Sequence, residues 1–181
     1  MGVENQNFPR IERILPPDLQ AFYIKARQET YASSKPAVFG LNVVGFKGYK
    51  FYDNETDYFY QDNYMDKEKR PGNFGGWELI TKYSFGGPRL SFYTYGGGLT
   101  AAGLIKGEKA VYGQLKKFLA ERATEARFGK SLRGGTWVAH NQWNFRSDGK
   151  IHDWGWEDAE QIALNNNLVY EFRGVGVVFV S

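Results

Sequence analysis

Apolar positions follow a helical period in two parts of the chain and a period of two elsewhere. Residues 17–31 place apolar side chains at helical spacing, behind a proline pair and an aspartate that suit a first helical turn. From 37 to 99 short β-branched and aromatic runs alternate, which predicts an antiparallel meander. A second helix is predicted over 107–129, with Gly129 as its stop. Strands resume from 136, with turns expected at SDGK and NNN.

The order helix, strands, helix, strands suggests a duplication. Glu78-Leu-Ile80 precedes a turn and an aromatic strand ending in glycines, and Glu160-Gln-Ile162 does the same. A second register pairs Glu78 with Glu157, and chance similarity between two aromatic meanders is the alternative to a repeat. The pattern predicts an α+β fold made of two pseudo-repeated halves, each a helix plus an antiparallel meander.

These halves are expected to form one domain. We predict a polar N-terminal arm at 1–16 and a single α+β domain at 17–181, with halves of about 17–104 and 105–181. The length of 181 residues is enough to bury a core.

Glu78 lies in a strand whose two faces differ. Trp77 and Leu79 share one face with Thr81, Tyr83 and Phe85, and we expect a helix to cover that face. Glu78 and Ile80 share the other face, which would be solvated or line a groove. A solvated glutamate is the ordinary case for a strand. Burial among aromatics would instead raise the carboxyl pKa and favour cationic or hydrogen-bonding ligands.

Aromatic residues make up 17% of the chain and bring twelve Tyr and five Trp, whose polar tips suit a cleft or an interface. Core packing is the competing explanation for each ring. The candidate ligand-binding residues are Glu78, Glu160, Tyr60, Asp62, Tyr64, Tyr93, Tyr95 and Trp156.

Charge and composition exclude several classes of site. The net charge of +3 and the lack of long basic runs do not imply nucleic acid. The chain has no cysteine and no apolar run of membrane-helix length, so we expect a cytoplasmic protein without membrane contact. His140 and His152 lack metal-binding spacing, and the glycine-rich stretch lacks a phosphate-binding motif, so no metal or cofactor is expected.

An ordered set of short motifs resembles the bacterial domain of unknown function 5680, which occurs alone or attached to Xre-type helix-turn-helix regulators. The similarity covers about residues 19–180. It rests on ARQETYA at the end of the first helix, Tyr60-x-Asp62-x-Tyr64, Phe74-x-Gly76-x-Glu78-x-Ile80, Pro88 with Gly96, and Glu160-x-Ile162 ahead of Val169-Tyr170.

The chain departs from the family pattern at several positions. Leu90 stands at the aromatic position after the proline, Asp158 stands where glycine is expected, and RGVG replaces the family's terminal motif. The chain has no helix-turn-helix. The resemblance implies no established chemistry. Duplicated units of this kind are similar in fold to gyrase-inhibitor-like ligand-binding domains, which hold an acid in their pocket.

The leading hypothesis is a non-enzymatic module that binds a small aromatic or cationic molecule in an acidic, aromatic-lined groove. The first alternative is a hydrolase in which one carboxylate acts as general base on a water. The second is a protein-interaction module, for instance a homodimer formed through a strand edge or an aromatic surface.

Overall fold

The computed structural model describes residues 16–30, 33, 46–65, 72–122 and 127–179. The arm predicted before Pro16 and most of the strand predicted from residue 37 lie outside these ranges. The helices are α1 (Pro17–Glu29), α2 (Ala101–Lys106), α3 (Glu108–Glu121) and the short 3₁₀ helix η3 (Leu132–Gly135). The strands are β1 (Phe46–Asp53), β2 (Tyr58–Met65), β3 (Asn73–Lys82), β4 (Arg89–Leu99), β5 (Val138–His140), β6 (Trp143–His152), β7 (Gly155–Leu164) and β8 (Asn167–Val178).

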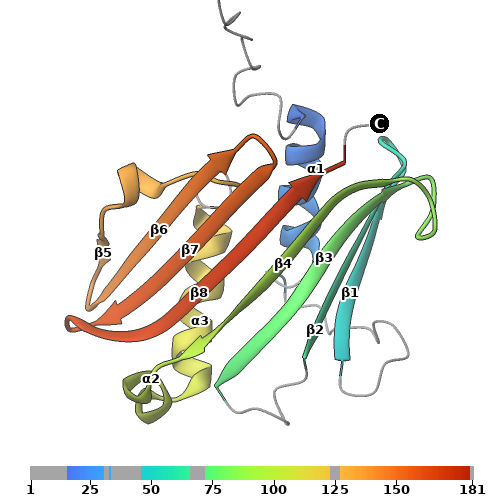
Figure 1. The fold of residues 1–181 in the computed structure, drawn as a ribbon. Helices are drawn as coiled ribbons and strands as arrows, with labels where there is room; N and C mark the ends of the chain where they lie inside the picture. Colours follow the sequence, from blue (N-terminus) through green and yellow to red (C-terminus); the bar gives the residue numbers. More distant parts are fainter. Residues whose placement is uncertain (1–15, 31–32, 34–45, 66–71, 123–126, 180–181) are drawn as a thin grey trace, which may run out of the picture.

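All eight strands join one antiparallel, open sheet in the order β1-β2-β3-β4-β8-β7-β6-β5 (Figure 1). Each of the two four-strand groups is a meander, and β4 pairs with β8 at the centre. β1 and β5 form the edges. The predicted α+β class and antiparallel meanders are confirmed.

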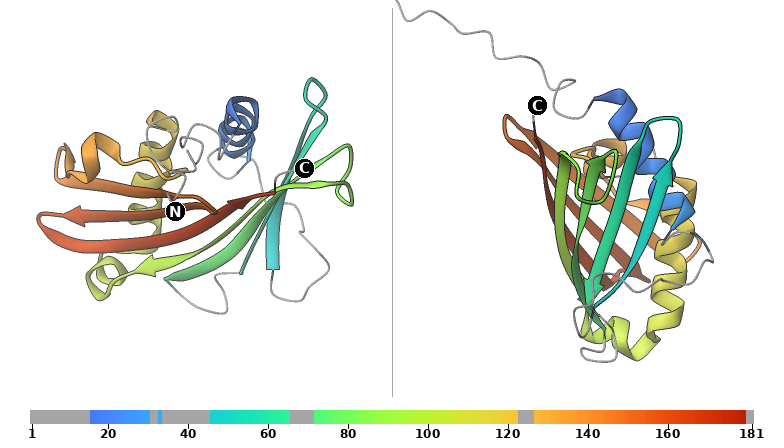
Figure 2. Two further views of the ribbon diagram at one scale, coloured as in Figure 1. Left: turned by 45° about the horizontal axis from the view of Figure 1, so that its top comes forward. Right: turned by 90° about the vertical axis from the view of Figure 1, so that its right-hand side faces the viewer.

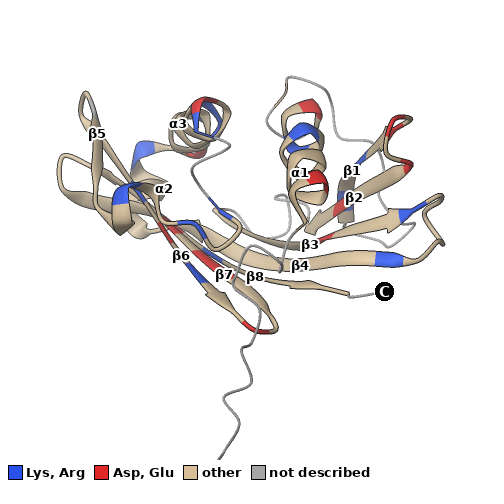
Figure 3. Ribbon diagram, turned by 90° about the horizontal axis from the view of Figure 1, so that it is seen from above, with Lys and Arg blue, Asp and Glu red and all other residues tan. Residues whose placement is uncertain are grey.

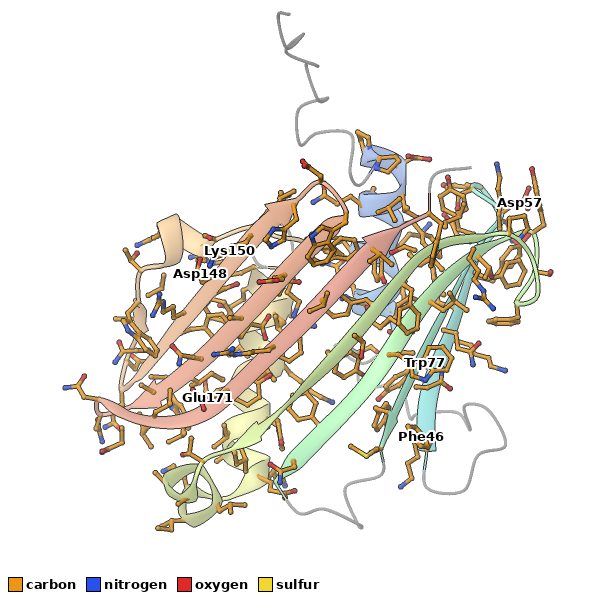
Figure 4. The ribbon with its side chains drawn as sticks, in the orientation of Figure 1. Phe46, Asp57, Trp77, Asp148, Lys150 and Glu171 are labelled. Carbon is orange, nitrogen blue, oxygen red and sulfur yellow. The ribbon has the colours of Figure 1, made fainter. Side chains whose placement is uncertain are left out.

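The helices α1 and α3 lie on the same face of the sheet, as the views in Figure 2 and Figure 3 show. No described helix covers the opposite face. Trp77 and Glu171, labelled in Figure 4, lie on that uncovered face. The sheet therefore has one face packed against helices and one open face, as is common for antiparallel sheets.

The prediction for the two faces of β3 was wrong. Ile80 is fully buried and Glu78 is 2% exposed on the helix-covered face, while Tyr83 is 63% exposed. Trp77 stacks on Phe92 of β4 on the open face. Both faces of this strand carry apolar side chains, so the neighbouring strands and helices decided which face became the core.

The helical region after β4 also differs from the prediction. It begins earlier, with α2, and α3 ends at Glu121 rather than near residue 129. Gly107 separates the two helices with a φ of 97°, a left-handed value that favours glycine. Gly129 lies outside the helix, in a turn that faces β6 and β7.

In the second half, the strand predicted from residue 136 is divided into β5 and β6 by a turn at Asn141, whose φ is 58°. The turn predicted at SDGK was wrong, because these residues continue β6. Gly149 lets the backbone at Gly129 pack closely against β6, since a Cβ atom at position 149 would lie 2.3 Å from the Gly129 carbonyl carbon. The predicted turn at NNN is confirmed by Asn165 and Asn166, both with positive φ.

Candidate functional site

A buried ion pair joins the end of α1 to the middle of β3. Arg27 donates to both carboxylate oxygens of Glu78, with Nη2 to Oε2 at 2.6 Å and Nε to each oxygen at 3.2 Å. Arg27 is 6% exposed and Glu78 is 2% exposed. Arginine suits this position because its planar fork matches a carboxylate with two parallel hydrogen bonds.

A second pair of the same kind lies on the other half of the sheet. Arg127 donates to Glu160 through Nε at 2.5 Å and through Nη2 at 3.0 Å. Glu160, in β7, is fully buried. Arg127 lies in the turn that follows α3, where Arg127, Phe128 and Gly129 all have positive φ. Three consecutive left-handed residues are costly, so this turn is held by its surroundings.

Aromatic faces complete the environment of both guanidinium groups. The Arg27 guanidinium carbon lies 4.6 Å from the ring centre of Phe128 and 4.9 Å from that of Tyr23. The Arg127 guanidinium carbon lies 4.5 Å from the ring centre of Phe172. Such contacts offset part of the cost of removing a cation from water.

Two further buried carboxyls lie on the same face of the sheet. Asp158 accepts hydrogen bonds from the backbone N–H groups of Phe128 and Gly129 and from the Tyr93 hydroxyl, which ties the left-handed turn to β7. Burial raises the pKa of Asp158 despite these donors.

Asp62, the other carboxyl, lies directly opposite Glu78 on the neighbouring strand β2. Its Oδ1 accepts a hydrogen bond from the Tyr95 hydroxyl at 2.6 Å. Burial and, second, the negative charge of Glu78 raise the pKa of Asp62 to about 8. Like charges at facing positions repel, so the Asp62 carboxyl retains its proton near neutral pH.

Asp62 and Glu78 line a cleft of about 330 Å³ on the helix-covered face. α3 forms one wall and strands of both halves form the other. This volume falls in the range of small-molecule sites. The acidic and basic side chains of the lining are Asp62, Glu78, Lys116 and Arg127. The rest of the lining is aromatic or aliphatic: Tyr49, Tyr64, Phe74, Tyr95, Tyr112, Leu115, Tyr170 and Phe172.

The structure divides the residues predicted for the ligand site. Four of them, Glu78, Asp62, Tyr64 and Tyr95, come together in the cleft. The others do not line it: Tyr60, Tyr93 and Trp156 are buried in the core, and Glu160 is held by Arg127.

The rings of Tyr93 and Trp156 stack on each other, with centres 5.8 Å apart, over the middle of β8. Glycines make room for them. A Cβ atom at Gly174 would lie 2.0 Å from the Tyr93 hydroxyl oxygen, and one at Gly176 would lie 2.1 Å from the Trp156 ring. The RGVG sequence of β8 is thus explained by close ring packing rather than by a ligand.

Sequence reasoning missed several residues of the site. Arg27 carried a usable signal, since it interrupts the buried stripe of α1 between Ala26 and Thr30. Arg127 carried none, because it lies in an irregular turn. Neither Tyr112 nor Lys116 of α3 was singled out from the sequence, and their place at the cleft depends on how α3 crosses the sheet.

The residues that the structure describes include no group of three or more His, Cys, Asp or Glu side chains placed to hold a metal ion. His152 stacks on the exposed ring of Trp154, away from the cleft. None of the described helices is long and apolar enough to cross a membrane.

Comparisons with protein-family models, with curated proteins and with solved structures find no match to this chain.

Proposed function

We propose that this protein is a non-enzymatic binding module for a small aromatic or cationic molecule. The observation that carries the proposal is the cleft of about 330 Å³, whose lining combines Asp62 and Glu78 with several aromatic side chains. Aromatic faces bind planar groups and cations, and a few buried polar groups orient the ligand. The residues that would contact the ligand are Asp62, Tyr64, Phe74, Tyr95, Tyr112 and Phe172.

The two halves of the domain are proposed to be structural repeats. Support comes from the long helices α1 and α3, each of which precedes a group of four antiparallel strands, and from the mirrored strand order around β4 and β8. The buried pairs occupy comparable places, since Glu78 and Glu160 lie in the third strand of each half. On this view only the first half kept an acidic site, because Ser147 faces Glu160 where Asp62 faces Glu78. The short motifs shared with the domain of unknown function 5680 support a relation to that family as a further part of this proposal.

Ligand screening by thermal shift and tryptophan fluorescence tests the binding function. The library should hold aromatic cations, neutral aromatics and aromatic anions of similar size. We expect at least one class to raise Tm, because binding to the folded state alone stabilises it. The variants Tyr64→Ala and Tyr95→Phe should weaken binding of that compound.

The matched control is Trp154→Ala, which removes a half-exposed ring outside the cleft. It should bind the compound as the native protein does. If no class raises Tm, or if the Tyr64 and Tyr95 variants bind the compound unchanged, the cleft is not a binding site.

Carboxylate-dependent hydrolysis is the second candidate, favoured by the raised pKa of Asp62 beside the Tyr95 hydroxyl. A carboxyl that titrates near neutral pH can exchange protons with a substrate or a water. This function predicts turnover of an ester or amide that is lost in Asp62→Asn. Binding without turnover in the native protein would exclude it for that compound.

A further inference from the structure

The buried charges on the helix-covered face do not balance around Asp62. Glu78 is neutralised by two-point contact with Arg27, and Glu160 by two-point contact with Arg127. Asp158 has three hydrogen-bond donors, two of them backbone N–H groups. Asp62 has no arginine of its own and a single side-chain hydrogen bond among the described residues, from Tyr95.

The position of Asp62 makes an unpaired negative charge costly. Its side chain is 3% exposed, it faces Glu78 across the strand pair, and it lines the cleft. A buried ionised carboxyl needs a compensating charge or it takes up a proton. A bound proton compensates the carboxyl in one way, and a ligand cation placed in the cleft would compensate it in the other.

We propose that Asp62 exchanges its proton for the positive charge of the ligand, so that a cation binds the cleft only as one proton leaves. The balance is simple: the protonated carboxyl and the free cation become a carboxylate–cation pair and a released proton. No bond to carbon forms or breaks. The inference rests on the proposed binding function and adds the charge of the ligand and its coupling to pH.

The other groups around Asp62 are poor candidates for this exchange. Glu78 is held by Arg27, and burial raises the hydroxyl pKa values of Tyr60 and Tyr49, so these two tyrosines stay protonated. Lys116 is exposed on α3 and adds a basic side chain to the lining. The charged or titratable groups facing Asp62 are Tyr23 and Arg27 of α1, Tyr49 of β1, Tyr60 of β2, Glu78 of β3, Tyr95 of β4 and Arg127 after α3.

The walls of the cleft suit a cation of this kind. The rings of Tyr49 and Tyr64 stack with centres 5.9 Å apart, and Phe74, Tyr95 and Phe172 lie close together on the neighbouring strands. Aromatic faces stabilise an organic cation without supplying a competing negative charge. The carboxylate of Asp62 then supplies the one full charge.

The test uses a permanently charged probe, benzyltrimethylammonium, and its neutral carbon isostere, neopentylbenzene. NMR titrations of the full chain measure Kd for each probe at several pH values. For the cation we expect affinity to rise about tenfold per pH unit from about pH 6 to about pH 8 and then to level off. The rise follows because less work is needed to remove the Asp62 proton as the pH approaches its pKa. The neutral isostere should show no such slope.

Asp62→Asn keeps the acceptor for Tyr95 and removes the titrating group. In this variant the cation should bind weakly and without a pH slope. Glu171→Gln is the matched control, since Glu171 is exposed on the open face of the sheet, and it should keep the native slope. The ¹³C shift of the Asp62 carboxyl should report a protonated group at neutral pH in the free protein and a carboxylate in the complex.

If the cation binds, three results would overturn the inference. They are equal affinity for cation and isostere, cation affinity that does not change with pH, and a native pH slope in Asp62→Asn. If one of these results is found and the neutral isostere binds, the proposed binding function still holds, with a neutral ligand. Failure of the cation to bind at about 1 mM also overturns the inference. The proposed function is then decided separately by the library screen and the Tyr64 and Tyr95 variants.

Discussion

At the scale of single residues, two arginines each bind a buried carboxylate and pack on aromatic rings, which lysine could not do in the same way. Arg27 and Arg127 each reach a buried glutamate with two nitrogens while their flat guanidinium groups rest on aromatic rings. An ammonium group has neither the fork nor the plane for this. The core therefore contains charges that are tolerated only as complete pairs.

Removing one partner of such a pair should be far more damaging than removing a surface charge. Arg27→Ala leaves Glu78 buried and uncompensated, and we expect it to lower the free energy of unfolding by about 3–5 kcal/mol. Lys25→Ala removes a cation from the same helix. The Lys25 side chain is 49% exposed and pairs with Asp53. The loss of stability in Lys25→Ala should be far smaller, because water screens an exposed ion pair.

Chemical denaturation of both variants measures the difference. Similar losses for Arg27→Ala and Lys25→Ala would show that the buried pair has no special weight.

At the scale of elements, the turn after α3 connects the two charged pairs to the rest of the fold. Phe128 packs against Arg27, and Arg127 binds Glu160. The backbone of this turn is held by Asp158, which accepts hydrogen bonds from the N–H groups of Phe128 and Gly129. A local segment thus brings side chains of α1, β3 and β7 into one cluster. Its left-handed backbone is maintained by tertiary contacts rather than by local preference.

Glycine at position 129 is expected to be required in this turn. Its φ is 70°, and a Cβ atom there would lie 2.3 Å from Cγ1 of Ile151 and 3.0 Å from the Lys150 carbonyl oxygen. Gly129→Ala should cost about 2–4 kcal/mol, the sum of a left-handed penalty and overpacking. Gly134, with a φ of 67° and nothing within 4 Å of its Cβ position, is the matched control.

Gly134→Ala should cost about 1–2 kcal/mol, the left-handed penalty alone. Urea denaturation of the two variants checks the comparison. If Gly129→Ala loses no more stability than Gly134→Ala, the turn is not packed as tightly as described.

At the scale of the whole molecule, the buried acids link folding to pH. The pKa of Asp62 is about 8 in the folded protein, against 3.8 for an ordinary aspartate. The folded state therefore binds more protons than the unfolded state between these values. The stability contributed by Asp62 is fully present below its unfolded-state pKa of 3.8 and is lost as the pH rises toward its folded-state pKa of about 8.

We expect the free energy of unfolding to fall with rising pH over this interval, by at most about 1.4 kcal/mol per pH unit from Asp62. Asp62→Asn should flatten the dependence, although Asp158 will retain some slope because burial raises its pKa as well. Denaturation curves of both proteins at several pH values measure it. A native protein that becomes more stable than Asp62→Asn as pH rises would contradict the assignment.

Much of the element order could be read from the sequence. The helical stripe of α1, the alternating strands, the hairpin turn before β4 and the turn between β7 and β8 follow from local periodicity and turn residues. Local signals misplaced the end of α3 and a turn in β6. Gly129 and Gly149 are glycines because two segments pack closely there. In the sequence alone, such a glycine cannot be told from one that marks a turn.

The candidate site was predictable only in part, for a physical reason. Sequence alone placed Asp62, Tyr64 and Glu78 among aromatics and left open whether Glu78 was solvated. The assembled sheet decided the matter, because the face that carries Glu78 also carries Ile80 and meets the helices. Which acid is paired and which is left with a proton depends on arginines that arrive from distant segments. Periodicity determines which residues share a face, and only tertiary packing determines which face is buried and which charges meet there.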